Sequence, residues 1–421
     1  MNETLLAKER ALIIGVNVNQ DPYFLESIEE LKNLAIACNI EPIAEITQNL
    51  PRPNVAHYVG SGKIEEIRQL ADSEEIDVLI FEDELTPSQI RNLAKLLDIE
   101  VIDRTRLILD IFAHRAKTKE AKMQVEIARL RYALPRLRNS NQNFGHQRGG
   151  AVKNRGAGET KLELKRRKVE EKITELEAEL KNIALTRVTQ RKKRVISGAP
   201  RVALVGYTNA GKSTLMNAMV RLSGSDEEKL VYEENMLFAT LDTSVRSIKF
   251  ENSKTILLSD TVGFINKLPH HLVKAFHSTL EEVREADLLL HVIDKSNPHH
   301  ELQLEVTNDT LKLINADDIP QILIYNKCDL LEDMNEEMGD NVALISAKKQ
   351  LGFKELVLKI SQSVFAHEQV YKLLIPFDAG QIISNLKSSG SILAMDYEER
   401  GTILTVSLNE ATYGSLKKYE L

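Results

Sequence analysis

Apolar and polar positions alternate with two different periods along the first hundred residues. Four runs of mostly branched apolar residues predict strands, at residues 11–16, 42–46, 78–81 and 100–102. Between them, apolar residues at helical spacing predict helices, at residues 23–38, 64–71 and 88–97. Strands that alternate with helices predict a small parallel sheet covered by helices.

The next stretch carries apolar residues at helical spacing only. The first set is Met123, Ile127, Leu130 and Leu134. The second set follows a seven-residue repeat, at Leu162, Val169, Leu176 and Ile183, with Ile173 and Leu180 between. These patterns predict two helices of similar length that pack antiparallel as a coiled-coil hairpin. Arg166 and Arg187 fall on inward positions, so we expect the ends of the seam to splay or to contact another group.

The second half returns to alternating strands and helices. Short apolar runs predict strands at residues 201–205, 255–258, 288–293, 321–325 and 342–345. The tail predicts a strand at 371–375, a helix at 379–386, paired strands at 391–396 and 402–408, and a final helix. The turn Glu398–Gly401 is typical of a hairpin. We find no chemistry in this tail and expect only a docking role for it.

The predicted fold class is therefore α/β with additional parts. It comprises a P-loop domain, an N-terminal parallel α/β subdomain with a helical hairpin, and a small C-terminal α+β domain. The expected boundaries are 1–112 for the α/β subdomain, 113–197 for the hairpin and its loop, 198–365 for the P-loop domain and 366–421 for the C-terminal domain.

Composition narrows the class of protein. The chain has 421 residues, 43% of them hydrophobic and 28% charged, as globular proteins do. The charged start MNETLLAKER predicts no secretory signal, and no apolar run is long enough to span a membrane. Two distant cysteines, Cys38 and Cys328, favour a reduced cytoplasmic protein and are too few for a zinc site.

Charge is distributed unevenly along the chain. The net charge is −7, yet residues 113–195 hold 23 Lys and Arg against 9 Asp and Glu. A strongly basic region within an acidic protein indicates a local contact with a polyanion.

The loop expected between the two hairpin helices, Asn139–Glu159, is basic and rich in glycine. Glycines let RNA approach the backbone, and the basic side chains can pair with phosphates or stack on bases. The candidate RNA contacts are Arg148, Gly149, Gly150, Lys153, Arg155, Gly156 and Gly158. The alternative is a plain flexible linker.

The run GYTNAGKS matches the phosphate-binding loop G-x-x-x-x-G-K-[ST], and it lies between a predicted strand and a predicted helix. Backbone N–H groups and a helix N-terminus converge in such a unit and bind phosphate. The candidate phosphate contacts are Gly206, Tyr207, Thr208, Asn209, Ala210, Gly211, Lys212, Ser213 and Thr214. Lys212 can reach the β- and γ-phosphates, and the Ser213 hydroxyl can bind Mg²⁺. The alternative is a glycine-rich turn without a ligand.

The run DTVGF supplies further candidate contacts with Mg²⁺ and with the γ-phosphate. Asp260 ends an apolar strand and suits a water-mediated Mg²⁺ contact, while the Gly263 N–H can bond a γ-phosphate. Thr240 is the candidate Mg²⁺-sensing threonine, with Thr243 as the alternative. Phe264 stands where related enzymes carry a water-positioning glutamine, so we expect slow intrinsic hydrolysis completed by another group or a partner.

The run NKCD predicts which base is bound. The Asp329 carboxylate can accept two parallel N–H bonds that guanine offers and adenine does not, so it selects GTP over ATP. Asn326 can bond the base and brace the loop, and the Lys327 stem can lie along the ring. The triplet Ser346, Ala347 and Lys348 can supply a backbone N–H to the guanine oxygen. The order of these pieces is what identifies a GTPase.

Several runs resemble the HflX family of translational GTPases. They are RGGAVKNRGAGETKLELKRR, YVGSGK, FEDELTPSQIRNL and VIDRTRLILDIFAHRAKTKEAKMQVEIARLRYALPRL, and the resemblance covers roughly residues 10–350. It implies a cytoplasmic GTPase that binds the large ribosomal subunit, inserts its hairpin toward the peptidyl-transferase centre and separates stalled ribosomes under stress. Phenylalanine at 264 fits the family, whereas Lys161, Lys165 and Thr243 depart from its pattern.

The expected ligands and partners are GTP or GDP, Mg²⁺, and the large ribosomal subunit with its RNA, bound by a monomer. Three other functions remain open: a GTPase that assembles the large subunit, a GTP-dependent switch for protein partners, and nucleic-acid remodelling driven by ATP. Asp329 argues against the last of these.

Overall fold

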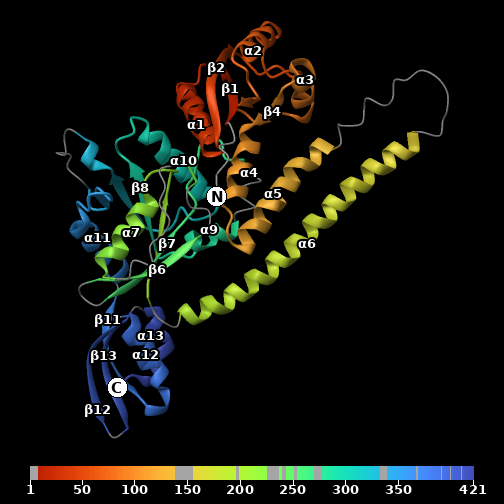
Figure 1. The fold of residues 1–421 in the computed structure, drawn as a ribbon. Helices are drawn as coiled ribbons and strands as arrows, with labels where there is room; N and C mark the ends of the chain where they lie inside the picture. The colour runs from red at the N-terminus through yellow and green to blue at the C-terminus, as the bar shows by residue number, and fades with distance from the viewer. Residues whose placement is uncertain are drawn as a thin grey trace, which may run out of the picture. The chain divides into compact units, whose positions relative to one another are not determined.

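A computed structural model of the chain describes residues 8–137, 155–195, 199–224, 237–238, 243–250, 254–269, 277–331, 339–366, 368–389, 391–398, 400–408 and 410–421. The chain folds as two compact units. The first comprises residues 1–181 with 267–275, and the second comprises residues 182–266 with 276–421. Figure 1 labels the elements of both. The finer division into four parts stays a prediction.

A four-stranded parallel sheet forms the base of the first unit. Its strands are β1 (Glu9–Val18), β2 (Ile40–Leu50), β3 (Val78–Phe81) and β4 (Glu100–Asp103). Its covering helices are α1 (Phe24–Ala37), α2 (Ser61–Ser73) and α3 (Pro87–Leu97). The strand order is β2-β1-β3-β4, and all neighbours pair in parallel, as predicted. Ala11–Ile14 of β1 are fully buried, which explains their unbroken apolar run.

Three helices follow the sheet: α4 (Arg104–Arg115), α5 (Lys119–Leu137) and α6 (Arg155–Val195). The prediction of two hairpin helices of similar length is wrong, because α5 has 19 residues and α6 has 41. The expected loop also ends too late, since α6 begins at Arg155 and includes Gly156 and Gly158. Two glycines cost about 2 kcal/mol in a helix, and the helix-forming run from Glu159 onward offsets that cost.

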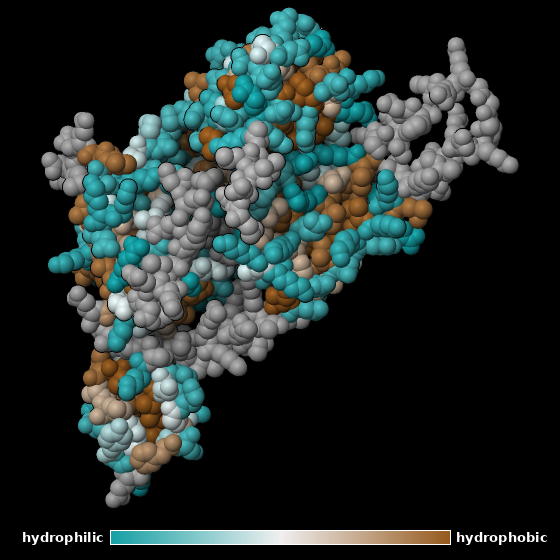
Figure 2. All heavy atoms as spheres, viewed as in Figure 1, coloured by the Kyte–Doolittle hydropathy of each residue, from teal (hydrophilic) through white to brown (hydrophobic). Residues whose placement is uncertain are grey.

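The seven-residue seam agrees with the burial of α6. Ile173 and Leu176 are buried, and Val169 and Leu180 are half-buried, whereas Leu164 beside the seam is 56% exposed. Figures 1 and 2 show α5 and α6 running antiparallel, with hydrophobic residues of α6 on the side toward α5. An ion pair of 3.1 Å joins Lys119 to Glu179. The hairpin therefore has an apolar seam with charged residues at its margin.

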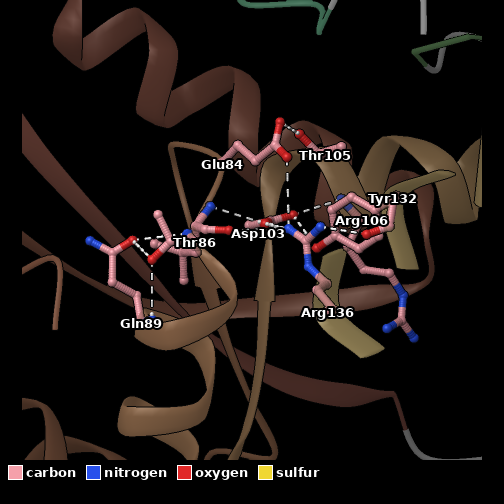
Figure 3. A network of polar contacts seen from close by, with 9 residues as sticks. Glu84, Thr86, Gln89, Asp103, Thr105, Arg106, Tyr132 and Arg136 are labelled. Carbon is pink, nitrogen blue, oxygen red and sulfur yellow. Dashed lines mark hydrogen bonds and ion pairs between the residues drawn. The ribbon is translucent and has the colours of Figure 1, made fainter. Parts of the chain in front are cut away.

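A buried carboxylate anchors α5 to the sheet (Figure 3). Asp103 ends β4, is fully buried, and accepts hydrogen bonds from Tyr132 Oη at 2.8 Å and Arg136 Nη2 at 3.1 Å. It also accepts the backbone N–H groups of Leu85 at 3.0 Å and Arg106 at 2.8 Å. The Arg136 guanidinium lies 3.3 Å from the ring centre of Tyr132. Two of the four donors to this carboxylate, Tyr132 and Arg136, thus hold the carboxyl end of α5 against the sheet.

The second unit contains a six-stranded sheet of order β10-β9-β8-β5-β7-β6. Its strands are β5 (Arg201–Gly206), β6 (Ser244–Lys249), β7 (Thr255–Asp260), β8 (Leu288–Asp294), β9 (Gln321–Asn326) and β10 (Val342–Leu344). The helices in this region are α7 (Lys212–Leu222), α9 (His277–Arg284), α10 (His300–Leu313) and α11 (Phe353–Phe365). Only β6 pairs antiparallel, so the carboxyl ends of the other five strands share one edge of the sheet.

The tail forms a second, three-stranded antiparallel sheet within the same unit. Its order is β11-β13-β12, made of β11 (Gln369–Ile375), β12 (Ile392–Glu398) and β13 (Gly401–Leu408). The helices α12 (Gly380–Ser389) and α13 (Glu410–Leu416) accompany it. The predicted hairpin and helices are confirmed. Glu368 ties the tail to β7 through an ion pair of 2.8 Å with Lys254.

No helix in the described part of the chain is long and apolar enough to cross a membrane. Both cysteines, Cys38 and Cys328, are free thiols.

Candidate nucleotide-binding site

The phosphate loop joins the carboxyl end of β5 to the start of α7, as predicted. Two of its glycines are required by close contacts. A Cβ at Gly206 would lie 2.2 Å from the carbonyl oxygen of Val292, and one at Gly211 would lie 2.2 Å from Asn326 Nδ2. Gly211 also has φ +95°, a conformation that side chains disfavour. The loop therefore wraps tightly over the ends of β8 and β9.

Lys212 lies beneath this loop. Its Nζ donates hydrogen bonds to the carbonyl oxygens of Gly206 at 3.0 Å and Tyr207 at 2.7 Å. Burial lowers the pKa of Lys212 to about 8, and the nearby Asp260 carboxylate opposes that shift. Phosphate charge would favour the ammonium form, because an adjacent anion raises the pKa of a buried amine. The ammonium is thus held in the centre of the loop.

Ser213 and Asp260 come together although 47 residues separate them. The Ser213 hydroxyl donates to Asp260 Oδ2 at 2.7 Å, and Asp260 is fully buried at the end of β7. A hydroxyl beside a carboxylate offers the oxygen ligands that Mg²⁺ prefers. In the described residues no group of three or more His, Cys, Asp or Glu could hold a metal.

Gly263 packs directly onto the phosphate loop. A Cβ there would lie 2.8 Å from both Cα and Cγ2 of Thr208 and 2.9 Å from Lys212 Nζ. Only glycine therefore lets the chain pass this close to the lysine. Thr208 is itself buried, and its hydroxyl oxygen has no hydrogen-bond partner within the described part of the chain. The sequence includes Thr208 among the loop residues but does not single out its hydroxyl.

Phe264 is buried rather than directed at the nucleotide edge. It is 1% exposed, its N–H donates to the Gly206 carbonyl at 3.2 Å, and its carbonyl accepts from the Thr208 N–H at 2.8 Å. Its side chain thus serves as packing, and its backbone locks this segment against the phosphate loop.

Asn326 links the phosphate loop to the guanine-selecting loops. Its Nδ2 donates to the Ala210 carbonyl at 2.9 Å, and its Oδ1 accepts from the Ala347 N–H at 2.9 Å. Because Asn326 and Ser346 are both buried, this brace is shielded from water. The bracing role predicted for Asn326 agrees with this geometry.

Two charged partners of the guanine-selecting residues were not predicted from the sequence. Lys327 Nζ pairs with Asp294 Oδ2 at 2.6 Å, and Lys349 Nζ pairs with Asp329 Oδ2 at 3.3 Å. The Ser346 hydroxyl, followed by Lys349, lowers the pKa of Asp329. Asp294 ends the apolar strand β8 beside Asn326. A polar residue at the end of an apolar run is the signal that could have identified Asp294 as a site residue. Lys348 is exposed next to them.

Some predicted site residues cannot be placed. Thr240 lies outside the described residues, whereas Thr243 is half-buried just before β6. Of the candidate RNA contacts, Arg148, Gly149, Gly150 and Lys153 also lie outside them, while Arg155, Gly156 and Gly158 belong to α6. Thr214 is half-buried in the first turn of α7, and Asn209 is exposed in the loop with φ +61°.

Three protein-family models match the chain in order. A model described as "GTP-binding GTPase N-terminal" matches residues 25–113, and one described as "GTP-binding GTPase Middle Region" matches residues 115–194. A third, described as "50S ribosome-binding GTPase", matches residues 201–327. Together they match most of residues 25–327 and end within the guanine-selecting run NKCD, before residues 328–421.

Curated relatives match nearly the whole chain. The GTPase HflX of Caldanaerobacter subterraneus subsp. tengcongensis is 42% identical over 95% of this chain and 91% of its own length. The Escherichia coli GTPase HflX is 37% identical, over 94% of this chain and 92% of its own. Among solved structures, a GTP-binding protein from Sulfolobus solfataricus in complex with GDP is 28% identical with a TM-score of 0.44, over 84% of this chain and 98% of its own.

Proposed function

The chain belongs to the HflX family of GTPases and hydrolyses GTP to GDP and phosphate, and we propose that it does so on the large ribosomal subunit. In this proposal it is a cytoplasmic monomer that dissociates or rescues stalled ribosomes, and the ribosome activates its GTPase. The family whose model matches residues 201–327 is described as a 50S ribosome-binding GTPase, which supports the choice of partner.

The burial of Phe264 is the observation that carries this proposal. A residue that is 1% exposed and bonded through its backbone to the phosphate loop cannot position the attacking water. Hydrolysis by this family member then needs a water-positioning group from elsewhere. A partner that supplies or orders this group would make turnover depend on its presence, as in GTPases that are activated by a second protein.

The phosphate loop, Gly206 to Thr214, would hold the phosphates through its N–H groups, with Lys212 on the β- and γ-phosphates. Gly263 would donate its N–H to the γ-phosphate. Bound Mg²⁺ neutralises charge that develops between the β- and γ-phosphates. Ser213 would bind the ion directly, Asp260 would hold one of its waters, and Thr240 would complete the set.

Guanine would lie between two loops at the ends of β9 and β10. Asp329 would accept the two guanine N–H bonds, Asn326 would brace the base, and the Lys327 stem would lie along the ring. The N–H groups of Ser346, Ala347 and Lys348 would face the guanine oxygen. The pair between Lys349 and Asp329 keeps the carboxylate charged, as an acceptor of two N–H bonds must be.

The basic hairpin supplies the contact with ribosomal RNA in this proposal. Residues 113–195 carry a large excess of positive charge, and the Asp103 network fixes the carboxyl end of α5, just before the expected loop, on the sheet. A helix end that is fixed in this way would hold the start of the basic loop in a defined position. The RNA contacts would be Arg148, Gly149, Gly150, Lys153, Arg155, Gly156 and Gly158. GTP would order the switch segments, and hydrolysis would release them.

Sedimentation with complete ribosomes tests this proposal. We expect the chain with a non-hydrolysable GTP analogue to co-sediment with large subunits and to convert complete ribosomes into subunits, and with GDP to do neither. Replacing Arg148, Lys153 and Arg155 by Glu should abolish both effects. A matched variant with Glu at Lys95, Lys312 and Lys354, exposed lysines on α3, α10 and α11, should retain them.

The alternatives predict other outcomes. An assembly GTPase would bind only precursor large subunits and would leave complete ribosomes intact. A switch for protein partners would bind neither, and the charge-reversed loop variant would behave as the unmodified chain does.

A further inference from the structure

Thr208, the third residue of the phosphate loop, carries a buried hydroxyl. The residue is 6% exposed, and its Oγ1 has no hydrogen-bond partner in the part of the chain that the structure describes. Two other buried threonines of the same unit are satisfied. The Thr261 hydroxyl donates to the Leu204 carbonyl at 2.6 Å, and the Thr307 hydroxyl donates to the Gln303 carbonyl at 2.8 Å. Because an unsatisfied buried hydroxyl lowers stability, the one on Thr208 indicates a place where a ligand binds.

The backbone of Thr208 is already bonded to the segment that follows β7. Its N–H donates to the Phe264 carbonyl at 2.8 Å, and the Phe264 N–H donates to the Gly206 carbonyl at 3.2 Å. A phosphate loop commonly binds its ligand through backbone N–H groups, but the N–H of Thr208 is used by this bond. A contact between Thr208 and a phosphate is therefore left to the hydroxyl.

The neighbours of Thr208 place its side chain at one end of the phosphate site. A Cβ built on Gly263 would lie 2.8 Å from Thr208 Cγ2 and 2.9 Å from Lys212 Nζ, so the threonine side chain and the ammonium both border Gly263. The Gly263 N–H is the proposed donor to the γ-phosphate. The N–H groups of the first turn of α7 lie at the other end of the loop and suit the phosphates nearer the nucleoside. Thr208 therefore lies at the γ-phosphate end of the loop.

We propose that the Thr208 hydroxyl is a further substrate contact, which recognises the γ-phosphate of GTP. The hydroxyl donates its hydrogen bond to a γ-phosphate oxygen, beside the Gly263 N–H, and is satisfied only when GTP is bound. GDP ends at the β-phosphate and offers this hydroxyl no acceptor. The inference rests on the proposed function, because it places the γ-phosphate beside Gly263 and Lys212, and it involves no ribosome.

The hydroxyl has effects of opposite sign on the free chain and on GTP binding. Without a γ-phosphate it destabilises the fold, because folding removes it from water without giving it a new partner. With a γ-phosphate it donates to a charged acceptor, and such a hydrogen bond is stronger than one between neutral groups. A side chain that only packs within the loop would affect GTP and GDP equally. Removing the hydroxyl alone therefore distinguishes the two roles.

Nucleotide affinity and thermal unfolding of the full-length chain, without ribosomes, test this proposal. Thr208→Val keeps the branched shape and the methyl group beside Gly263, and it removes the hydroxyl. With Mg²⁺ present, we expect the dissociation constant of the imido analogue of GTP to rise at least about tenfold and that of GDP to stay within about twofold, as for one lost hydrogen bond to the charged γ-phosphate. The thermal midpoint of the nucleotide-free variant should equal or exceed that of the unmodified chain.

Two further variants make the result decisive. Thr208→Ser keeps the hydroxyl and loses the methyl group, so the ratio of the two dissociation constants should stay that of the unmodified chain. Thr307→Val is the matched control, because Thr307 is fully buried on α10 of the same unit and its hydroxyl bonds within the helix. This control should leave the ratio unchanged and should lower the thermal midpoint, since it removes a hydrogen bond that the free chain makes.

An unchanged ratio of the two dissociation constants in Thr208→Val would overturn the proposal, as would a thermal midpoint below that of the unmodified chain. If Thr208→Val fails to fold, Thr208→Ala decides by the same ratio. Gly263→Ala tests the γ-phosphate position itself, because its Cβ would crowd that end of the loop. If Gly263→Ala weakens binding of the analogue more than that of GDP while Thr208→Val does not, only the role of the hydroxyl is rejected. The proposed action on the ribosome could hold under any of these results.

Discussion

Single side chains in the guanine-selecting loops do two tasks at once. Asn326 bonds the phosphate loop through one end of its amide and the Ala347 backbone through the other. Asp329 keeps its charge through Ser346 and Lys349. The residues proposed to recognise the base therefore also hold the two loops together, and replacing the Asp329 carboxylate should change the preferred base.

Asp329→Asn should change the preferred nucleotide. An amide offers one donor and one acceptor, which fits the N1–H and C2 carbonyl of xanthine but opposes the 2-amino group of guanine. We expect GTP affinity to fall about 100-fold, as for the loss of a charge-assisted pair of hydrogen bonds, and XTP binding to appear. Titration with fluorescent GTP and XTP analogues measures both. Asp309→Asn, an exposed carboxylate on α10, should change neither, and unaltered base preference in Asp329→Asn would refute the assignment.

His291 makes the second unit sensitive to acid. Burial lowers the pKa of this histidine to about 4, below its ordinary 6.5. Between these values the unfolded chain binds a proton that the folded chain does not, so stability falls as the pH drops from 6.5 toward 4. The expected loss between pH 7 and pH 5 is about 2 kcal/mol.

Chemical denaturation of the second unit at pH 7 and pH 5 measures this loss. His291→Gln should remove most of it, because glutamine does not titrate. His299→Gln, in the same unit before α10, should leave it in place. The same decline in His291→Gln as in the unmodified chain would show that other groups cause it.

At the scale of elements, strand ends were easier to predict than helix lengths. Asp260 and Asn326 each end an apolar run, as the sequence predicted, and the parallel pairing of these strands brings both ends to one edge of the sheet. The length of α6 was misjudged because glycines at 156 and 158 favour a loop locally. The helix-forming residues that follow, together with the seam against α5, outweigh that local preference.

The link between α5 and the N-terminal sheet should depend on the Asp103 network. Tyr132→Phe removes one of four donors to the buried carboxylate and should lower the free energy of unfolding of the first unit by about 1.5–3 kcal/mol, the range for a hydrogen bond to a charged group. Amide hydrogen exchange of α5 peptides measures where the loss falls. Tyr397→Phe, at a tyrosine that is 73% exposed on β12, is the control. Equal protection of α5 in both variants would contradict the anchoring role.

Across the whole molecule, the sequence predicted the four-stranded parallel sheet, the five parallel strands of the six-stranded sheet, the antiparallel tail and the order of the nucleotide-binding motifs, but not the antiparallel strand β6. It missed the pairs between Lys327 and Asp294, Lys349 and Asp329, and Lys267 and Glu82. Each joins residues whose proximity arises only when strand ends or separate segments meet, and no local pattern marks them. The proposed partner rests on family membership and on the charge distribution rather than on any one contact.

The whole account depends on one claim, that a GTPase whose Phe264 is buried needs the large ribosomal subunit for efficient turnover. The most direct test is the GTP turnover rate of the full chain with and without purified large subunits at moderate salt. We predict slow turnover alone and at least about a tenfold increase with subunits, as expected when a partner supplies or orders the missing catalytic group. Rapid turnover by the chain alone, or a rate that saturating subunits leave unchanged, would contradict the account.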